Sequence, residues 1–205
     1  MRFLGYDPGG KGTHGVAAIQ VSEVGEILGD PLCEVVEDAE AAWTWLSSYT
    51  DAQALGIDTL LAWSPSGSRE CDNVLRRKYR EHAPTVIPQN ALYSSMTLNG
   101  AMVARRAADR SLLLFESHPK LLVKVLPVTD PASADILKTY TALKAAGEGV
   151  RKAAKQADDK ADAVVAAWCA AQGHSGRWVT DLFKTSGGRL ENVADRVKYP
   201  WFEVL

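Results

Sequence analysis

Short apolar runs separated by glycine-rich turns dominate the first part of the chain. Residues 2–6 are apolar and lead into Pro8-Gly9-Gly10, and residues 14–21 alternate between apolar and polar positions. Alternation of this kind beside a glycine-rich turn is typical of paired β-strands. A third strand is expected within residues 26–36, after the turn at Gly25. The pattern therefore predicts two or three antiparallel strands before the first helix.

Helix-like and strand-like segments alternate along the rest of the chain. Residues 54–58 form a compact apolar run that ends in an acid, and residues 111–116 have the continuous apolar character of a buried strand. Helices are expected at residues 38–49, from about Arg69 after a cap by Ser68, and at 94–110, 118–125, 134–146 and 158–172. The two later strands are parallel if a helix crosses between them. We therefore expect an α/β fold with a mixed sheet, antiparallel in its first three strands and then parallel, flanked by helices.

Length and composition favour one domain over residues 1–205. A chain of 205 residues is long for one average domain and short for two, and no segment has the composition of a linker. Residues 187–205 are predicted to form a carboxy-terminal extension. Its aromatic segment, Tyr199-Pro200-Trp201-Phe202, is expected to pack on the body of the protein, because exposed aromatic side chains are costly.

The sequence is typical of a cytoplasmic protein that does not contact a membrane. Residues 1–7 reach an acid too soon to hold the apolar stretch of a signal peptide, and no apolar run is long enough to span a bilayer. Cys33, Cys71 and Cys169 are odd in number and widely spaced, which indicates neither a disulfide framework nor a zinc site.

The formal net charge of −2 argues against a protein that coats nucleic acid non-specifically, since that mode of binding needs an excess of Lys and Arg. A nucleic-acid enzyme remains compatible with this charge, because an acidic metal site consumes negative charge locally. The basic segments 76–80 and 105–106 are compatible with a phosphate track, and equally with a solvated helix face.

Four aspartates occupy positions suited to a shared site. Asp7 and Asp58 each end a predicted strand, and Asp159 and Asp162 are three residues apart in a predicted helix, where such positions share a face. Carboxylates about 4 Å apart repel by about 4 kcal/mol per ionised pair at an effective dielectric of about 20, so a cluster must bind protons or cations. Oxygen ligands suit Mg²⁺ or Mn²⁺, which can activate water for phosphodiester cleavage.

Each acid taken singly also has a structural interpretation. Asp7 fits an ordinary turn, Asp58 can end a strand through its own backbone, and Asp158 or Asp159 can cap a helix. Asp162 fits such an interpretation less well, because it leads into a stretch that is apolar nearly all round, where an acid requires a partner or a metal.

These residues resemble bacterial proteins of a domain family of unknown function that are predicted RNase H-like nucleases. The segments that carry the resemblance are Phe3-Leu4-Gly5-Tyr6-Asp7-Pro8-Gly9-Gly10, Gly56-Ile57-Asp58, Ser68-Arg69-Glu70-Cys71-Asp72 with Arg76, Phe115-Glu116-Ser117-His118-Pro119 and Asp158-Asp159-Lys160-Ala161-Asp162-Ala163. Their order is also similar to that of the Holliday-junction resolvase RuvC. One departure is Asp58, where the resolvase pattern has a glutamate.

The resemblance implies an RNase H-like nuclease that acts on DNA or RNA with Mg²⁺ or Mn²⁺. It assigns the metal-binding and catalytic positions to Asp7, Asp58, Asp159 and Asp162. Residues expected near the site or in contact with substrate are Glu116, His118, Arg69, Arg76 and Lys11. Arg69, Asp72, Arg76 and Arg80 fall at helical spacing, which suits either a phosphate-binding stripe or a ladder of intrahelical ion pairs.

Three alternative functions fit parts of the sequence. Residues 5–11 match the first part of a phosphate-binding P-loop, but Gly12 stands where Ser or Thr should coordinate Mg²⁺, and a strand is expected next. An actin-like nucleotide binder would usually need two such domains. A scaffold that keeps the acids and binds nucleic acid or protein without cleavage is also possible, because fold alone does not determine function.

Overall fold

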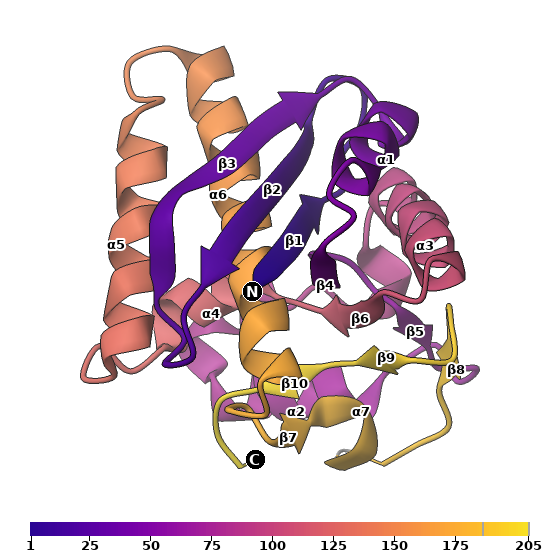
Figure 1. The fold of residues 1–205 in the computed structure, drawn as a ribbon. Coiled ribbons are helices and arrows are strands. Elements are labelled where there is room, and N and C mark those ends of the chain that lie inside the picture. The colour runs from indigo at the N-terminus through magenta and orange to yellow at the C-terminus, as the bar shows by residue number, and fades with distance from the viewer. Residues whose placement is uncertain (186, 205) are drawn as a thin grey trace.

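The centre of the protein is a mixed sheet of six strands in the order β3-β2-β1-β4-β6-β9, seen in a computed structural model that describes residues 1–185 and 187–204 (Figure 1). The strands are β1 (Arg2–Asp7), β2 (His14–Val21), β3 (Ile27–Val36), β4 (Ala52–Ile57), β6 (Leu113–Glu116) and β9 (Val197–Lys198). β1, β2 and β3 pair antiparallel, and the pairs β1–β4, β4–β6 and β6–β9 are parallel. The predicted α/β class and strand directions are confirmed.

Helices cover both faces of this sheet (Figure 1). α6 (Arg151–His174) lies along β1, β2 and β4, and α5 (Pro131–Ala145) packs beside it. α1 (Ala39–Ser47) and α3 (Ser94–Asp109) pack together on the opposite face. The shorter helices are α2 (Glu70–Lys78), α4 (Pro119–Val125) and α7 (Leu182–Thr185), with 3-10 turns η1 (Arg80–Thr85) and η2 (Gln89–Ala91). Among the described residues, no helix is both long enough and apolar enough to cross a membrane.

Alternation along the strands divides the core into two layers. Phe3 and Ile19 belong to the cluster on the α6 side, whereas Leu4 and Tyr6 belong to the cluster beneath α1 and α3. This is the pattern of a sheet whose successive side chains point to opposite faces, both of them covered.

Three glycines let the backbone of α6 rest directly on the sheet. A Cβ atom added at Gly5 would lie 1.8 Å from the carbonyl oxygen of Ala163. One at Gly56 would lie 1.9 Å from the carbonyl oxygen of Ala166, and one at Gly15 would lie 2.1 Å from that of Asp159. No side chain fits in such a gap, so these glycines fix how closely the acid-bearing helix approaches β1, β2 and β4.

Three predicted helix starts need correction. α6 begins at Arg151 rather than at residue 158. α5 begins at Pro131 rather than at residue 134. The Asp130 side chain caps it by accepting a hydrogen bond from the Ser133 backbone N–H, and Pro131 occupies the first turn of the helix. Ser68 does not cap α2, because the cap position belongs to Arg69 and carries no side-chain cap bond.

The carboxy-terminal segment is built into the core. β9 extends the main sheet beyond β6, and the small strands β7 (Thr180–Asp181) and β10 (Pro200–Trp201) pair with each other. A further pair joins β5 (Ala62–Trp63) to β8 (Glu191–Asn192). Tyr199 and Trp201 are fully buried, which confirms that the aromatic segment packs on the body of the protein.

Candidate functional site

Asp7 and Asp58 lie side by side at the carboxyl ends of two neighbouring parallel strands. Tyr6 of β1 pairs with Ile57 of β4, and the backbone N–H of Asp58 donates to the carbonyl oxygen of Tyr6 at 2.9 Å. Asp7 is buried and Asp58 is half-buried. The parallel register therefore brings together two acids that are 51 residues apart (58 − 7) in the sequence.

Helix α6 adds Asp159 and Asp162 to the same region. Both side chains are buried, at 1% and 0% exposure, although each carries a carboxyl group. They share one face of the helix, as their spacing predicts. Because α6 already begins at Arg151, neither Asp158 nor Asp159 caps it, and that interpretation is wrong.

The negative charges of Asp58, Asp159 and Asp162 all act on Asp7, and these four acids are hereafter called the acid cluster. Burial raises the pKa of Asp7 well above its usual range, and the charges of Asp58, Asp162 and Asp159 raise it further, in that order. Burial also raises the pKa of Asp162 to about 7, with Asp58 as the next largest cause. The pKa of Asp58 rises to about 7 through burial, opposed by the ammonium of Lys120.

Two lysines partly neutralise the acid cluster, and the sequence did not reveal them as site residues. The Lys120 ammonium, on α4, lies 3.2 Å from Asp162 Oδ2 and 3.4 Å from Asp158 Oδ2. Lys155 forms an ion pair with Asp159 one helical turn away. Asp158 lies at the edge of the acid cluster, where the Lys144 ammonium contacts it at 2.7 Å. Burial raises the pKa of Asp158, but Lys144 and Lys120 outweigh burial and the pKa is lowered overall.

Several carboxylate oxygens of the acid cluster remain without hydrogen bonds. Oδ1 of Asp162 and Oδ2 of Asp159 are buried and have no hydrogen-bond partner within the described part of the chain, whereas Oδ2 of Asp162 faces the Lys120 ammonium at 3.2 Å. In that same part, no three His, Cys, Asp or Glu side chains are placed so that they could hold one metal ion together. The carboxylate oxygens are thus suitable ligands for a hard cation. In their present positions, however, two of the acids pair with lysines instead of converging on one point.

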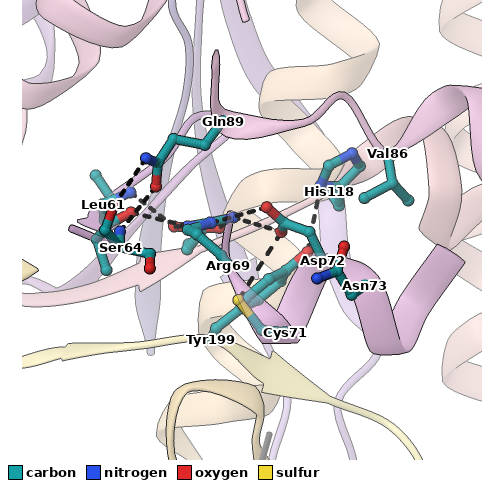
Figure 2. A network of polar contacts seen from close by, with 12 residues as sticks. Leu61, Ser64, Arg69, Cys71, Asp72, Asn73, Val86, Gln89, His118 and Tyr199 are labelled. Atoms are coloured by element: carbon teal, nitrogen blue, oxygen red, sulfur yellow. Dashed lines mark hydrogen bonds and ion pairs between the residues drawn. The ribbon is translucent and has the colours of Figure 1, made fainter. Parts of the chain in front are cut away.

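Arg69 and Glu116 belong to a different arrangement, a buried network with Asp72 that we call the closed network (Figure 2). Arg69 donates to Asp72 through Nε and Nη2, at 2.9 and 2.6 Å, and to Glu116 through Nη1 and Nη2, at 2.9 and 2.6 Å. Its fifth hydrogen bond reaches the carbonyl oxygen of Ala62 at 3.1 Å. All five guanidinium N–H groups are used, so Arg69 has no free donor for a phosphate in this arrangement, which favours the ion-pair interpretation of its helical spacing with Asp72.

The other residues expected near the site have structural contacts or lie in solvent. Arg76 donates to the backbone oxygens of Ala83 and Val86, and His118 Nε2 contacts the backbone oxygen of Thr85 at 3.0 Å. Both contacts hold the segment that follows α2. Lys11 is largely exposed, with its ammonium 3.5 Å from Glu37.

No protein-family model matches the chain, and no curated protein matches it significantly. The functional inference below therefore depends on the site.

Proposed function

We propose that this protein is a metal-dependent phosphodiester hydrolase of RNase H-like architecture that acts on DNA or RNA. The strand order β3-β2-β1-β4-β6 agrees with this proposal, as do acids at the ends of β1 and β4 and on a late helix. The observation that carries the proposal is Asp162, a carboxyl group at 0% exposure whose Oδ1 lacks a hydrogen bond among the described residues and whose Oδ2 meets only the half-exposed Lys120 ammonium in an ion pair. A buried acid without such partners is costly unless a ligand compensates it.

Asp7, Asp58 and Asp162, with Asp159 beside them, are the residues that would hold Mg²⁺ or Mn²⁺. A divalent ion would supply the positive charge that Lys120 and Lys155 provide only in part to these four acids. Bound there, the ion would activate water and stabilise the leaving oxygen of a phosphodiester. The acids themselves would set the position of the ion from the ends of β1 and β4 and from α6, once their side chains turned from their present positions toward it.

Cleavage assays with aspartate variants test the proposal. We expect Asp7→Asn and Asp162→Asn to cleave DNA or RNA at least about 100-fold more slowly with Mn²⁺. Removing a residue that only supports a metal ligand costs about 10- to 100-fold, so removing a ligand itself should cost at least the upper value. Substrates should include branched, duplex and single-stranded forms of both nucleic acids. Asp30→Asn is the matched control, since Asp30 is exposed on β3, and it should cleave as the unaltered protein does.

The lysine pairing of the acid cluster favours one second candidate, a scaffold that binds without cleaving. Lys120 and Lys155 already offset part of the charge that would otherwise demand a metal. Binding of nucleic acid by the unaltered protein, with no cleavage above the Asp7→Asn background on any substrate, would support the scaffold and reject the hydrolase.

A further inference from the structure

A groove of about 770 Å³ lies between the loop after β1, the end of β3 and the first turns of α6. Three segments that are far apart in the sequence line it: residues 11–13, residues 35–37 and, from α6, residues 151, 152, 155 and 156. Lys155 of this lining also forms the ion pair with Asp159. The groove therefore adjoins the acid cluster at its α6 side.

Positive charge is concentrated in this groove, although the chain as a whole has a formal net charge of −2. Within the described part of the chain, the lining has one acidic side chain, Glu37, and four cationic ones, Lys11, Arg151, Lys152 and Lys155. All four cations belong to exposed residues. An excess of positive charge along a groove attracts an anionic partner and raises its local concentration.

The groove cations of α6 do not stabilise that helix. Lys155 lies four residues after Arg151 and three after Lys152, so like charges share one helix face, which is unfavourable. Positive charge in the first turn is also unfavourable beside the positive end of the helix dipole. Neither Arg151 nor Lys152 has an ion pair or a side-chain hydrogen bond with another described residue. Both side chains therefore remain available to a ligand.

We propose that this groove binds the sugar–phosphate backbone of the nucleic-acid substrate, on one side of the acid cluster. The inference rests on the proposed function and assigns the surface that holds the substrate strand. A row of cations matches the repeated negative charge of a strand, and Val35 and Val36 offer apolar surface to the sugars. Because Lys155 lines the groove and pairs with Asp159, a strand bound there passes directly to the acid cluster. An acidic protein segment would not need acids suited to phosphodiester cleavage beside it, so nucleic acid is favoured.

Oligonucleotide binding by the full chain in EDTA tests the groove without cleavage. Fluorescence anisotropy of labelled single-stranded and duplex DNA is followed over a range of salt concentrations. We expect Arg151→Gln and Lys152→Gln each to bind roughly three- to tenfold more weakly, with the slope of log affinity against log salt reduced by about 0.7–0.9, the value of one phosphate contact. Lys138→Gln is the matched control, because it removes the same charge from an exposed residue of the neighbouring helix α5 outside the groove, and it should bind as the unaltered protein does.

The acid of the groove allows a change in the opposite direction. The Glu37 carboxylate lies 3.5 Å from the Lys11 ammonium. Glu37→Gln removes this competitor for Lys11, so we expect roughly two- to threefold tighter binding of DNA. Asp30→Asn removes a negative charge from an exposed position of β3 outside the groove, and it should leave the affinity unchanged.

Stability and kinetics separate substrate binding from a structural role. Lys152→Gln should melt at the same or a slightly higher temperature, because it removes repulsion with Lys155. With Mn²⁺ present, it should raise KM for cleavage more than it lowers kcat. A lower melting temperature that accounts for the lost binding would contradict the proposal.

Three further results would overturn the proposal. They are no binding of DNA by the unaltered protein, an equal loss of affinity in Lys138→Gln and Lys152→Gln, and binding of polyglutamate as tight as that of DNA. Groove-dependent binding without cleavage of any substrate would reject only the hydrolase. Cleavage with an unchanged KM in Lys152→Gln would reject only the groove.

Discussion

Two groups of buried acids meet near the ends of β4 and β6, and their hydrogen bonding differs. In the closed network, Arg69 uses every N–H group, and Glu116 also accepts a hydrogen bond from the Leu61 backbone at 2.6 Å. In the acid cluster, Asp162 is buried as deeply, but within the described residues its Oδ1 has no hydrogen bond and its Oδ2 has only an ion pair with the half-exposed Lys120. Net charge does not separate the two, since carboxylates outnumber cations in both. The difference lies in their hydrogen bonds. Every carboxylate oxygen of the closed network accepts a hydrogen bond, whereas buried oxygens of the acid cluster, for which we propose a ligand, do not.

Breaking the closed network should have the largest effect. We expect Arg69→Met to lower the free energy of unfolding by about 3–5 kcal/mol, because it leaves Asp72 and Glu116 buried without their cation. Urea denaturation followed by circular dichroism measures this loss. Arg77→Met is the matched control on the same helix, since the Arg77–Glu70 pair is as short, at 2.6 Å, but exposed. That variant should lose less than about 1 kcal/mol. Equal losses in the two variants would show that the closed network is not a main source of stability.

Loss of protons from the acid cluster should destabilise the folded protein, so removing charge there should stabilise it, unlike removing the charge of Arg69 in the closed network. Asp58 and Asp162 have pKa values raised to about 7 in the folded protein from 3.8, chiefly by burial. A raised pKa means that the folded state binds protons more tightly than the unfolded state, so stability is lost as pH rises through about 7. In EDTA we therefore expect the free energy of unfolding to increase by several kcal/mol as pH falls from above 7 toward 4.

The Asp162→Asn variant sharpens this measurement. Its uncharged side chain should flatten the rise between about pH 7 and 4, whereas the exposed control Asp30→Asn should keep it. Urea denaturation at a series of pH values provides the comparison. A rise of the same size in Asp162→Asn would mean that the acid cluster is not the source of the pH dependence.

The strand directions and the two strand-end acids could be predicted from the sequence because they depend on short-range patterns. Gly5-Tyr6-Asp7 and Gly56-Ile57-Asp58 repeat the same order of residue types, and the structure pairs Gly5 with Gly56 in register. Each glycine lets α6 approach, and each acid follows two residues later at the carboxyl end of its strand. This repeat was a usable signal for the close packing of α6, although alternation of apolar residues alone did not reveal it.

The counterions of each acid could not be predicted, because ion pairs join segments that are distant in sequence. Arg69 and Asp72 have visible helical spacing, but Glu116 lies 47 residues from Arg69. Spacing alone therefore could not tell a phosphate-binding arginine from one sequestered in the closed network. Lys120 reaches Asp162 from another helix, and only Lys155, four residues before Asp159, had a local signal.

Removing Lys120 should have the smallest effect on stability and a measurable effect on metal affinity. Lys120 contacts Asp162 at 3.2 Å, yet its side chain is 51% exposed, so solvent screens the pair. We expect Lys120→Met to cost about 1 kcal/mol of unfolding free energy in EDTA. Since the ammonium group and a divalent ion compete for the same carboxylate, the variant should bind Mn²⁺ roughly five- to tenfold more tightly in calorimetric titration, a gain of about 1–1.4 kcal/mol.

Lys144→Met distinguishes competition at the acid cluster from a general change of charge. Lys144 has similar exposure, at 45%, but it contacts Asp158 and not Asp162. Both variants remove one positive charge from the same region, so a non-specific electrostatic effect would strengthen Mn²⁺ binding equally in the two. Tighter Mn²⁺ binding in Lys120→Met alone would mean that the Lys120 ammonium occupies the position of the metal in the acid cluster and is displaced when the metal binds. Weaker Mn²⁺ binding in Lys120→Met would contradict that competition, because it would mean that Lys120 supports the metal site instead of occupying it.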